Sequence, residues 1–155
     1  MKRKITGFHQ DINGDWVAEL DCYHNQHVRH KPPFFNRPWV ESQDGRDRML
    51  GSELECVRCN RLEWPEGLEP SGCSAEFTEE NMPQSFEEGD DHWVRIHVLD
   101  GTLVYSVGRP VSAIVELAAG ATGIIAPGMQ YSLAAKTNLR FYLEFYTRPN
   151  RVSGA

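Results

Sequence analysis

Four residues whose side chains commonly bind metal ions stand in two short groups. Cys22 and His24 form the first group, and Cys56 and Cys59 form the second as a Cys-x-x-Cys pair. Thiolate sulfur and imidazole nitrogen are the ligands of a tetrahedral Zn²⁺ site. A Cys-x-x-Cys turn can place two sulfurs on one ion, and a Cys-x-His segment can supply the other two ligands. The spacing therefore predicts a structural zinc site that ties the two groups together.

The identity of the fourth ligand is open from the sequence. The three cysteines are the expected sulfur ligands, and His24 is the nearest histidine, with His27 and His30 as alternatives. A Cys-x-x-Cys pair also occurs as a redox dithiol, but that motif is typical of a thioredoxin-like βαβ unit, which this sequence does not indicate. The remaining interpretation is that the cysteines are small buried residues and the histidines lie on the surface.

The composition is that of an ordinary soluble protein. With 155 residues, 40% hydrophobic and 25% charged, the chain can form one domain or two small ones. No apolar run is long enough to span a bilayer, and no apolar segment follows the basic N-terminus, so we expect neither a membrane anchor nor a signal peptide. Four cysteines at metal-like spacing indicate a reducing compartment, and we expect a cytoplasmic protein.

The net charge of −6 is unevenly distributed. Residues 1–61 contain 10 basic and 9 acidic side chains, whereas residues 62–155 contain 6 and 13. An acidic second half opposes binding to the phosphates of nucleic acids. We therefore expect a small molecule or a second copy of the chain as the partner, and neither nucleic acid nor a membrane.

A hairpin is expected to position the first metal-binding group. Residues 5–11 and 15–21 have the pattern of strands, and Asn13-Gly14 between them is typical of a two-residue turn with positive φ at both positions. The second strand would deliver Cys22 at its end. Because an isolated hairpin is marginally stable, a bound metal would supply the missing folding energy.

The segment between the two groups contains a proline-rich, aromatic and basic loop over residues 33–39. This composition fits a binding surface for a peptide or single-stranded nucleic acid, through stacking and charge. The interpretation that we favour is a stiff loop whose aromatic side chains cover a small core. A short helix is expected over residues 41–50, with Ser42 as its N-cap and Gly51 as its stop.

The second half of the sequence has a different character. Residues 62–81 are turn-forming and acidic and are interpreted as a linker between a metal-binding module, 1–61, and a β domain, 82–149, with a tail at 150–155. Many short strand patterns with Gly and Pro turns predict a mainly β fold, a sandwich or barrel. Asp100-Gly101 is expected to be a hairpin turn. The expected strands are residues 92–99, 102–107, 111–117, 123–126, 130–134 and 139–146.

Residues 5–60 resemble a small bacterial protein family of uncharacterised function. The resemblance rests on Gly7-Phe8-His9-Gln10-Asp11, Trp16-Val17-Ala18-Glu19-Leu20, Gln26-His27-Val28-Arg29-His30, Asn36-Arg37-Pro38-Trp39-Val40 and Leu54-Glu55-Cys56. It implies a compact Cys/His metal-binding type of module and brings no established chemistry.

Residues 82–149 resemble the cupin family found alone or at the N-terminus of tellurite-resistance methyltransferases. The matching residues are Met82-Pro83, Trp93, Val98-Leu99-Asp100-Gly101-Thr102-Leu103, Gly123-Ile124-Ile125-Ala126-Pro127 and Leu143-Glu144-Phe145-Tyr146. The resemblance implies a small double-stranded β-helix barrel that is often dimeric. No methyltransferase segment follows in this sequence, so that activity is not expected.

The sequence departs from a metal-holding cupin, which uses histidines and a carboxylate at the barrel mouth. It has no His-x-His pattern ahead of Trp93, and Tyr131 stands where such a cupin would place a histidine. The candidate residues of a barrel ligand site are His92, His97 and Tyr131. A divalent ion held by the two histidines with nearby acids is chemically reasonable, but we do not expect a second metal there. The nearby acids are Glu87, Glu88, Asp90 and Asp91.

The sequence contains no recognisable nucleophile–base pair and no glycine loop that would hold phosphates. The expected function is therefore that of a cytoplasmic two-module binding protein. Its structural zinc would fold the first module, and its barrel would bind a small molecule or form a dimer, with a link to tellurite or other stress resistance suggested by the resemblance. The alternative is a metal-dependent cupin enzyme that uses a divalent ion in the barrel.

Overall fold

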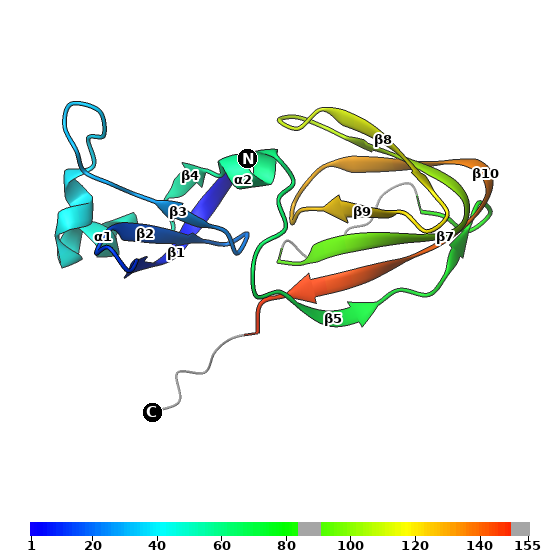
Figure 1. The fold of residues 1–155 in the computed structure, drawn as a ribbon, viewed down its shortest axis with the longest axis horizontal. Coiled ribbons are helices and arrows are strands. Elements are labelled where there is room, and N and C mark those ends of the chain that lie inside the picture. Colours follow the sequence, from blue (N-terminus) through cyan, green and yellow to red (C-terminus); the bar gives the residue numbers. More distant parts are fainter. Residues whose placement is uncertain (84–90, 150–155) are drawn as a thin grey trace. The chain divides into compact units, whose positions relative to one another are not determined.

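The computed structural model describes residues 1–83 and 91–149, and the chain divides into two compact units, Met1–Asn60 and Arg61–Ala155 (Figure 1). Strands dominate both units, and the helices are short. The prediction of a mainly β protein is therefore confirmed. Within the described residues, no helix combines the length and the apolar character that crossing a membrane would require.

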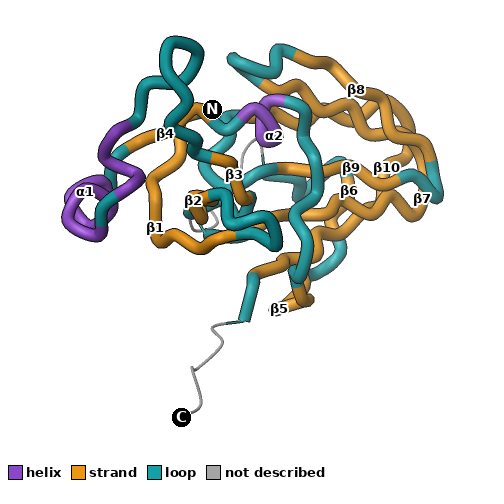
Figure 2. Tube along the Cα trace, turned by 60° about the vertical axis from the view of Figure 1, so that its left-hand side comes forward, coloured by secondary structure: helices purple, strands orange, loops and turns teal. Residues whose placement is uncertain are grey.

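The first unit is built on a four-stranded antiparallel sheet (Figure 2). The strands are β1 (Lys2–Gln10), β2 (Trp16–Leu20), β3 (Asn25–His27) and β4 (Glu53–Glu55), in the spatial order β3-β2-β1-β4. The sheet thereby brings the end of β2 and the end of β4, which are distant in sequence, to either side of the central strand β1. Besides three cysteines, the buried apolar side chains of the first unit are Ile5, Val17, Ala18, Leu20, Val28 and Val40.

The β1–β2 hairpin forms as expected, but its turn is longer than two residues. The amide of Asp11 donates to the carbonyl of Asp15 at 2.9 Å, and the Asp11 carboxylate accepts hydrogen bonds from the amides of Asn13 and Asp15. Of the residues between the two strands, only Gly14 takes a positive φ, at 80°. The prediction of a two-residue turn was therefore wrong. The carboxylate of Asp11 stabilises a wider turn, in which Asn13 does not take a positive φ.

The helix expected after residue 41 is confirmed. A short 3₁₀ turn, Pro38–Glu41, leads into α1 (Gln43–Met49), and the hydroxyl of Ser42 caps α1 by accepting from the amide of Gly45 at 3.0 Å. Gly51 follows α1 with φ at 82°, a conformation that favours glycine. A second helical turn, α2 (Val57–Asn60), begins directly after Cys56 and contains Cys59.

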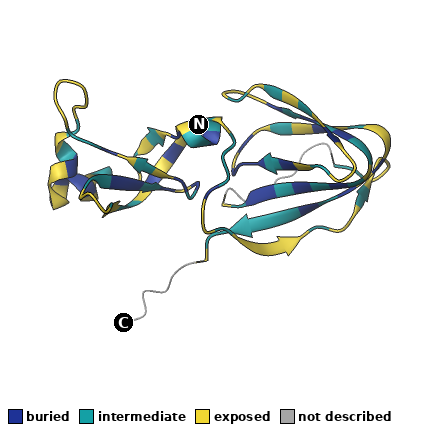
Figure 3. Cartoon of the chain, viewed as in Figure 1, coloured by how far each residue is buried: buried dark blue, intermediate teal, exposed yellow. Residues whose placement is uncertain are grey.

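The second unit is organised around two long antiparallel strands, β7 (Trp93–Val107) and β10 (Tyr131–Thr147). Four shorter strands extend the sheet: β8 and β9 pair with β7, and β5 and β6 pair with β10. Their bounds are β5 (Glu69–Cys73), β6 (Phe77–Thr78), β8 (Ala113–Ala118) and β9 (Thr122–Ile125). Buried and more exposed residues alternate along the strands, as Figure 3 shows, so one face of each long strand lines the apolar core.

Asp100-Gly101 does not form a hairpin turn, contrary to the sequence prediction. β7 runs through both residues, and Gly101 keeps φ at 76° inside the strand. A Cβ at Gly101 would overlap the carbonyl oxygen of Thr137 on β10. The pairing with β10 shifts register around Thr137, so the glycine serves a bulge rather than a turn. The same bulged pairing joins the two strands expected within residues 130–146 into one strand, β10.

Residues 62–81 were interpreted as a linker, but they contribute structure to the second unit. β5 and β6 lie in this range and pair antiparallel with β10. β5 is exposed along its whole length, which explains why its composition is polar and turn-like although it is a strand. An exposed edge strand does not alternate between apolar and polar residues, so its sequence does not identify it as a strand. The expected tail, residues 150–155, lies outside the described residues.

Candidate metal centre

Four potential metal ligands converge in the interior of the first unit. The sulfurs of Cys22, Cys56 and Cys59 and a ring nitrogen of His24 all lie within 4.8 Å of one another. Each of the four residues is at most 1% exposed. Burying three thiols and an imidazole together in this way places soft nitrogen and sulfur donors in a dry, closed environment, which suits a metal ion of the zinc type.

The loop after β2 carries the first two ligands. The amide of Tyr23 donates to the carbonyl of Leu20 at 2.9 Å, and the amide of Leu20 donates to the carbonyl of His24 at 3.0 Å. Tyr23 itself takes φ at 70°, a conformation that few residues other than glycine adopt. This tight turn directs the side chains of Cys22 and His24, the residues on either side of Tyr23, toward the same point.

The start of the helical turn α2 supplies the other two ligands, Cys56 just before it and Cys59 within it. Cys56 follows β4 directly, and its amide donates to the carbonyl of Met1 at 2.8 Å beside β1. The amide of Cys59 donates to the sulfur of Cys56 at 3.4 Å. Amide-to-sulfur bonds of this kind stabilise the thiolate form that a metal requires. Because β1 pairs with both β2 and β4, Cys22 and His24 after β2 come close to Cys56 and Cys59 after β4.

Four of the six distances within the cluster are close to the edges of a zinc-centred tetrahedron. The sulfurs of Cys22 and Cys56 are 3.8 Å apart. Nδ1 of His24 lies 3.6 Å from the sulfur of Cys22 and 3.4 Å from the sulfurs of Cys56 and Cys59. Zn–S bonds of about 2.3 Å and Zn–N bonds of about 2.0–2.1 Å at tetrahedral angles give S–S edges of about 3.8 Å and S–N edges of about 3.6 Å. A disulfide is excluded at this separation, since its sulfurs lie about 2.05 Å apart.

The electrostatics of the cluster without a metal show how strongly the thiols interact. The hydrogen bond between Cys22 and Cys56 raises the pKa of Cys22 above its ordinary value and lowers the pKa of Cys56. Burial alone would lower the pKa of His24, but its hydrogen bonds with Cys56 and Cys59 raise it to about 9. A divalent cation would replace this sharing of protons, because metal binding requires all four ligands in their deprotonated forms.

The two alternative histidines lie outside the cluster. Nε2 of His27, on β3, contacts a carboxylate oxygen of Asp11, in the turn between β1 and β2, at 2.8 Å. Nδ1 of His30 accepts a hydrogen bond from the amide of Arg37 at 3.0 Å and thereby closes the base of the proline-rich loop. The structure thus brings His24, and neither of these two, to the three sulfurs.

In the second unit, His97 points away from the apolar core. It alternates with the buried residues Ile96 and Val98 on β7 and so occupies the opposite face. Nε2 of His97 lies 3.0 Å from a carboxylate oxygen of Glu144, and the imidazole stacks on the ring of Tyr142 at 4.7 Å. The hydrogen bond from Tyr146 lowers the pKa of Glu144 below its ordinary value.

The structure does not gather the three residues expected at a barrel ligand site. Tyr131 pairs with Val107 at one end of β7, whereas His97 pairs with Tyr142 near the other end. His92 precedes β7 and lies 2.9 Å from a carboxylate oxygen of Asp91. Within residues 1–83 and 91–149, the Cys/His cluster of the first unit is the one group of three or more metal-binding side chains that converges. The acids expected to assist, Glu87, Glu88 and Asp90, lie outside the described residues.

Sequence reasoning missed an aromatic and cationic cluster on the outer face of β7 and β10. The guanidinium of Arg95 lies over the ring of Trp64 at 4.5 Å and near the ring of Tyr146 at 5.3 Å. Trp64 also contacts the rings of Trp93 and Tyr146 edge-on. The alternation along β7 already placed Arg95 and His97 on one face. The contact with Trp64 was not predicted, because Trp64 was assigned to the linker.

Comparisons with known protein families divide the chain in the same two parts. Residues 6–63 match the family DUF3565, described as a protein of unknown function. Residues 73–143 match the TehB-like domain family. No curated protein matches the chain.

Comparison with solved structures finds similarity over part of the chain. A crystal structure of a protein from Escherichia coli K12 matches with a TM-score of 0.52 at 14% identity, over 60% of this chain and 94% of that one. TehB from Haemophilus influenzae matches with a TM-score of 0.46 at 21% identity, over 54% of this chain and 32% of that one. A cupin-2 domain protein from Shewanella frigidimarina matches with a TM-score of 0.30 at 18% identity, over 50% and 64% of the respective chains.

Proposed function

We propose that this chain is a cytoplasmic two-unit binding protein whose first unit is folded by one structural zinc ion. The observation that supports the zinc assignment is the convergence of Cys22, His24, Cys56 and Cys59, with four of their six mutual distances close to the edges of a zinc tetrahedron. Three sulfurs and one imidazole are also the donor set of common structural zinc sites.

A structural role fits this centre better than a catalytic one. Catalytic zinc keeps one coordination position open to water or substrate, whereas structural zinc is closed by four protein ligands. Here four protein ligands are present, and all four are buried, so that the described residues leave no solvent-facing position. The sheet of the first unit has only four strands, three of which are five residues or shorter, so a metal would contribute much of its folding free energy.

For the second unit we propose a cupin-like barrel that binds a small molecule or forms a homodimer. Support comes from the TehB-like family match and from the fold shared with the Escherichia coli protein. The long bulged strands β7 and β10 suit a sheet that curves toward closure. Through the same family resemblance, we propose that the protein acts in resistance to tellurite or to another chemical stress.

Elemental analysis of the purified protein tests the zinc proposal. Wild-type protein should contain one zinc per chain, and Cys56→Ser should lose it. Cys73→Ser is the matched control, because Cys73 is exposed on β5 and is the one cysteine outside the cluster. Absence of zinc from protein grown and purified with zinc present, or its retention in Cys56→Ser, would refute the proposal. A second metal equivalent that is lost in His97→Ala would instead support a metal-dependent cupin enzyme.

A further inference from the structure

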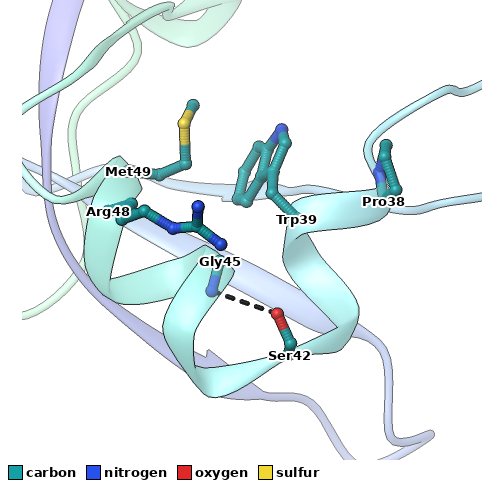
Figure 4. A pocket seen from close by; sticks show the side chains of 6 residues that line it. All are labelled: Pro38, Trp39, Ser42, Gly45, Arg48 and Met49. Carbon is teal, nitrogen blue, oxygen red and sulfur yellow. Dashed lines mark hydrogen bonds between the residues drawn. The ribbon is translucent and has the colours of Figure 1, made fainter.

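A groove in the first unit lies apart from the metal ligands. It has a volume of about 460 Å³ and lies between the 3₁₀ turn Pro38–Glu41 and α1 (Figure 4). That volume falls within the range of about 300–1,000 Å³ typical of small-molecule sites. The described residues that line it are Pro38, Trp39, Ser42, Gly45, Arg48 and Met49.

The wall of the groove is apolar and held in place. The indole of Trp39 packs against the ring of Phe8 on β1, with ring centroids 5.8 Å apart, which fixes the indole from the side of the sheet. The thioether of Met49 and the ring of Pro38 flank the indole (Figure 4). Such a wall suits a flat or branched apolar group, since aromatic rings and thioethers make favourable contacts with both.

The floor of the groove is a glycine that the packing requires. Gly45 lies inside α1, where glycine costs about 1 kcal/mol relative to alanine. A Cβ at this position would overlap the carbonyl oxygen of Trp39 and press on the hydroxyl of Ser42. The close approach of the 3₁₀ turn to α1 therefore depends on Gly45. This close approach shapes the groove.

The polar groups at the edge of the groove are hydrogen-bond donors. Nε of Arg48 donates to the carbonyl of Asp44 at 3.2 Å, while its terminal nitrogens bond to no other described residue and reach toward Trp39 in Figure 4. The hydroxyl of Ser42 already accepts from the amide of Gly45, so its own proton remains to be donated. No carboxylate is among the described side chains that line the groove.

We propose that this groove binds a small amphipathic carboxylate, with an aromatic or branched apolar group against Trp39 and Met49. The carboxylate would accept hydrogen bonds from the guanidinium of Arg48, whose planar fork matches its two oxygens. The hydroxyl of Ser42 lies on the same edge and would supply a further donor. A neutral ligand would leave the arginine without a charged partner, and a cationic ligand would be repelled by it.

Benzoate titrated into the zinc-loaded full chain and followed by ¹H–¹⁵N NMR tests this proposal. The chain has four tryptophans, and Trp39→Phe assigns the indole resonance in question. Benzoate should shift the indole N–H of Trp39 and the amide of Gly45 in a saturable way. Benzamide, which has the same shape without the charge, should bind at least about tenfold more weakly, as expected for a lost charge-assisted hydrogen bond.

Arg48→Gln should weaken benzoate binding by the same factor and bring it close to that of benzamide. Because Arg48 is exposed, this substitution should leave the fold intact, as an unchanged spectrum for the remaining residues would show. Arg61→Gln, at an exposed arginine outside the groove, is the control and should bind benzoate like the wild type. Equal binding of benzoate and benzamide, unchanged affinity in Arg48→Gln, or shifts confined to other residues would overturn the proposal.

Discussion

The sulfur of Cys22 lies 3.8 Å from the sulfur of Cys56, although 34 positions separate the two residues in the chain. β1 makes this approach possible, because it pairs with β2 on one side and β4 on the other. Two short strands, β3 and β4, have only three residues each. Strands this short contribute few hydrogen bonds, so under the proposed function the folding of the first unit should depend on a metal ion at the cluster.

Chelation should unfold the first unit selectively. Binding of structural zinc contributes about 10–16 kcal/mol in small zinc domains, which exceeds the stability of most domains of this size. With excess chelator, amide resonances of residues 1–60 should collapse into the unfolded range, while those of residues 91–149 keep their dispersion. Restoring zinc should restore the spectrum. Dispersed resonances for residues 1–60 in metal-free protein would show that the ion is not required for folding.

His24→Ala should abolish stoichiometric zinc binding, and His27→Ala and His30→Ala should preserve it. Nδ1 of His24 faces the three sulfurs, whereas the rings of His27 and His30 are engaged with Asp11 and Arg37. The measurement is zinc content after dialysis at equal protein concentration. Loss of zinc in His27→Ala or His30→Ala, with retention in His24→Ala, would place the nitrogen ligand elsewhere.

Gly101→Ala should destabilise the second unit by at least about 2 kcal/mol, since it combines an unfavourable positive φ with a clash against backbone. The clash is with the carbonyl oxygen of Thr137 on the neighbouring strand. Gly120→Ala is the matched control: Gly120 also has a positive φ, at 84°, but a Cβ there would meet nothing within 4 Å. It should cost only about 1 kcal/mol. Urea unfolding followed by resonances of β7 and β10 compares the two, and equal losses would contradict the assigned bulge.

Tyr146→Phe should raise the pKa of Glu144 toward its ordinary value. The phenol of Tyr146 donates to the Glu144 carboxylate, which favours the charged form and lowers the pKa. A depressed carboxyl pKa in the folded state adds stability above the pKa of the unfolded chain, and this stability is lost as pH falls through the folded-state value. A ¹³C-detected titration of the Glu144 side chain checks the shift. An unchanged pKa in Tyr146→Phe would show that His97 and Arg95 account for it.

The sequence predicted the parts of the structure that depend on local chemistry. Ser42 caps α1 because its hydroxyl reaches an amide three residues ahead, and this depends on nothing distant. The convergence of Cys22 with Cys56 and Cys59 was also predicted, because the ligand types themselves imply a common ion. His24 was the expected fourth ligand because it is the histidine nearest to Cys22 in sequence, and the structure brings it to the sulfurs. The turn at Tyr23 that directs its ring has a positive φ that no pattern in the sequence revealed.

The parts that could not be predicted depend on partners far away in the chain. Asp100-Gly101 has the composition of a hairpin turn, and only the approach of Thr137 on β10 shows that the glycine serves a bulge. β5 has no apolar alternation, since it is an exposed edge strand that β10 holds by backbone hydrogen bonds. His97 shares its face of β7 with Trp93 by strict alternation, yet Trp93 is fully buried and His97 pairs with Glu144. Burial at strand ends follows tertiary packing and cannot be assigned from alternation.

X-ray absorption at the zinc edge of the purified, zinc-loaded chain tests the central claim most directly. The distances among the sulfurs and the His24 nitrogen predict a first shell of three sulfurs at about 2.3 Å and one nitrogen at about 2.0–2.1 Å. Cys73→Ser should give the same spectrum. A shell made only of oxygen and nitrogen, or one with fewer than three sulfurs, would contradict a centre built from Cys22, His24, Cys56 and Cys59.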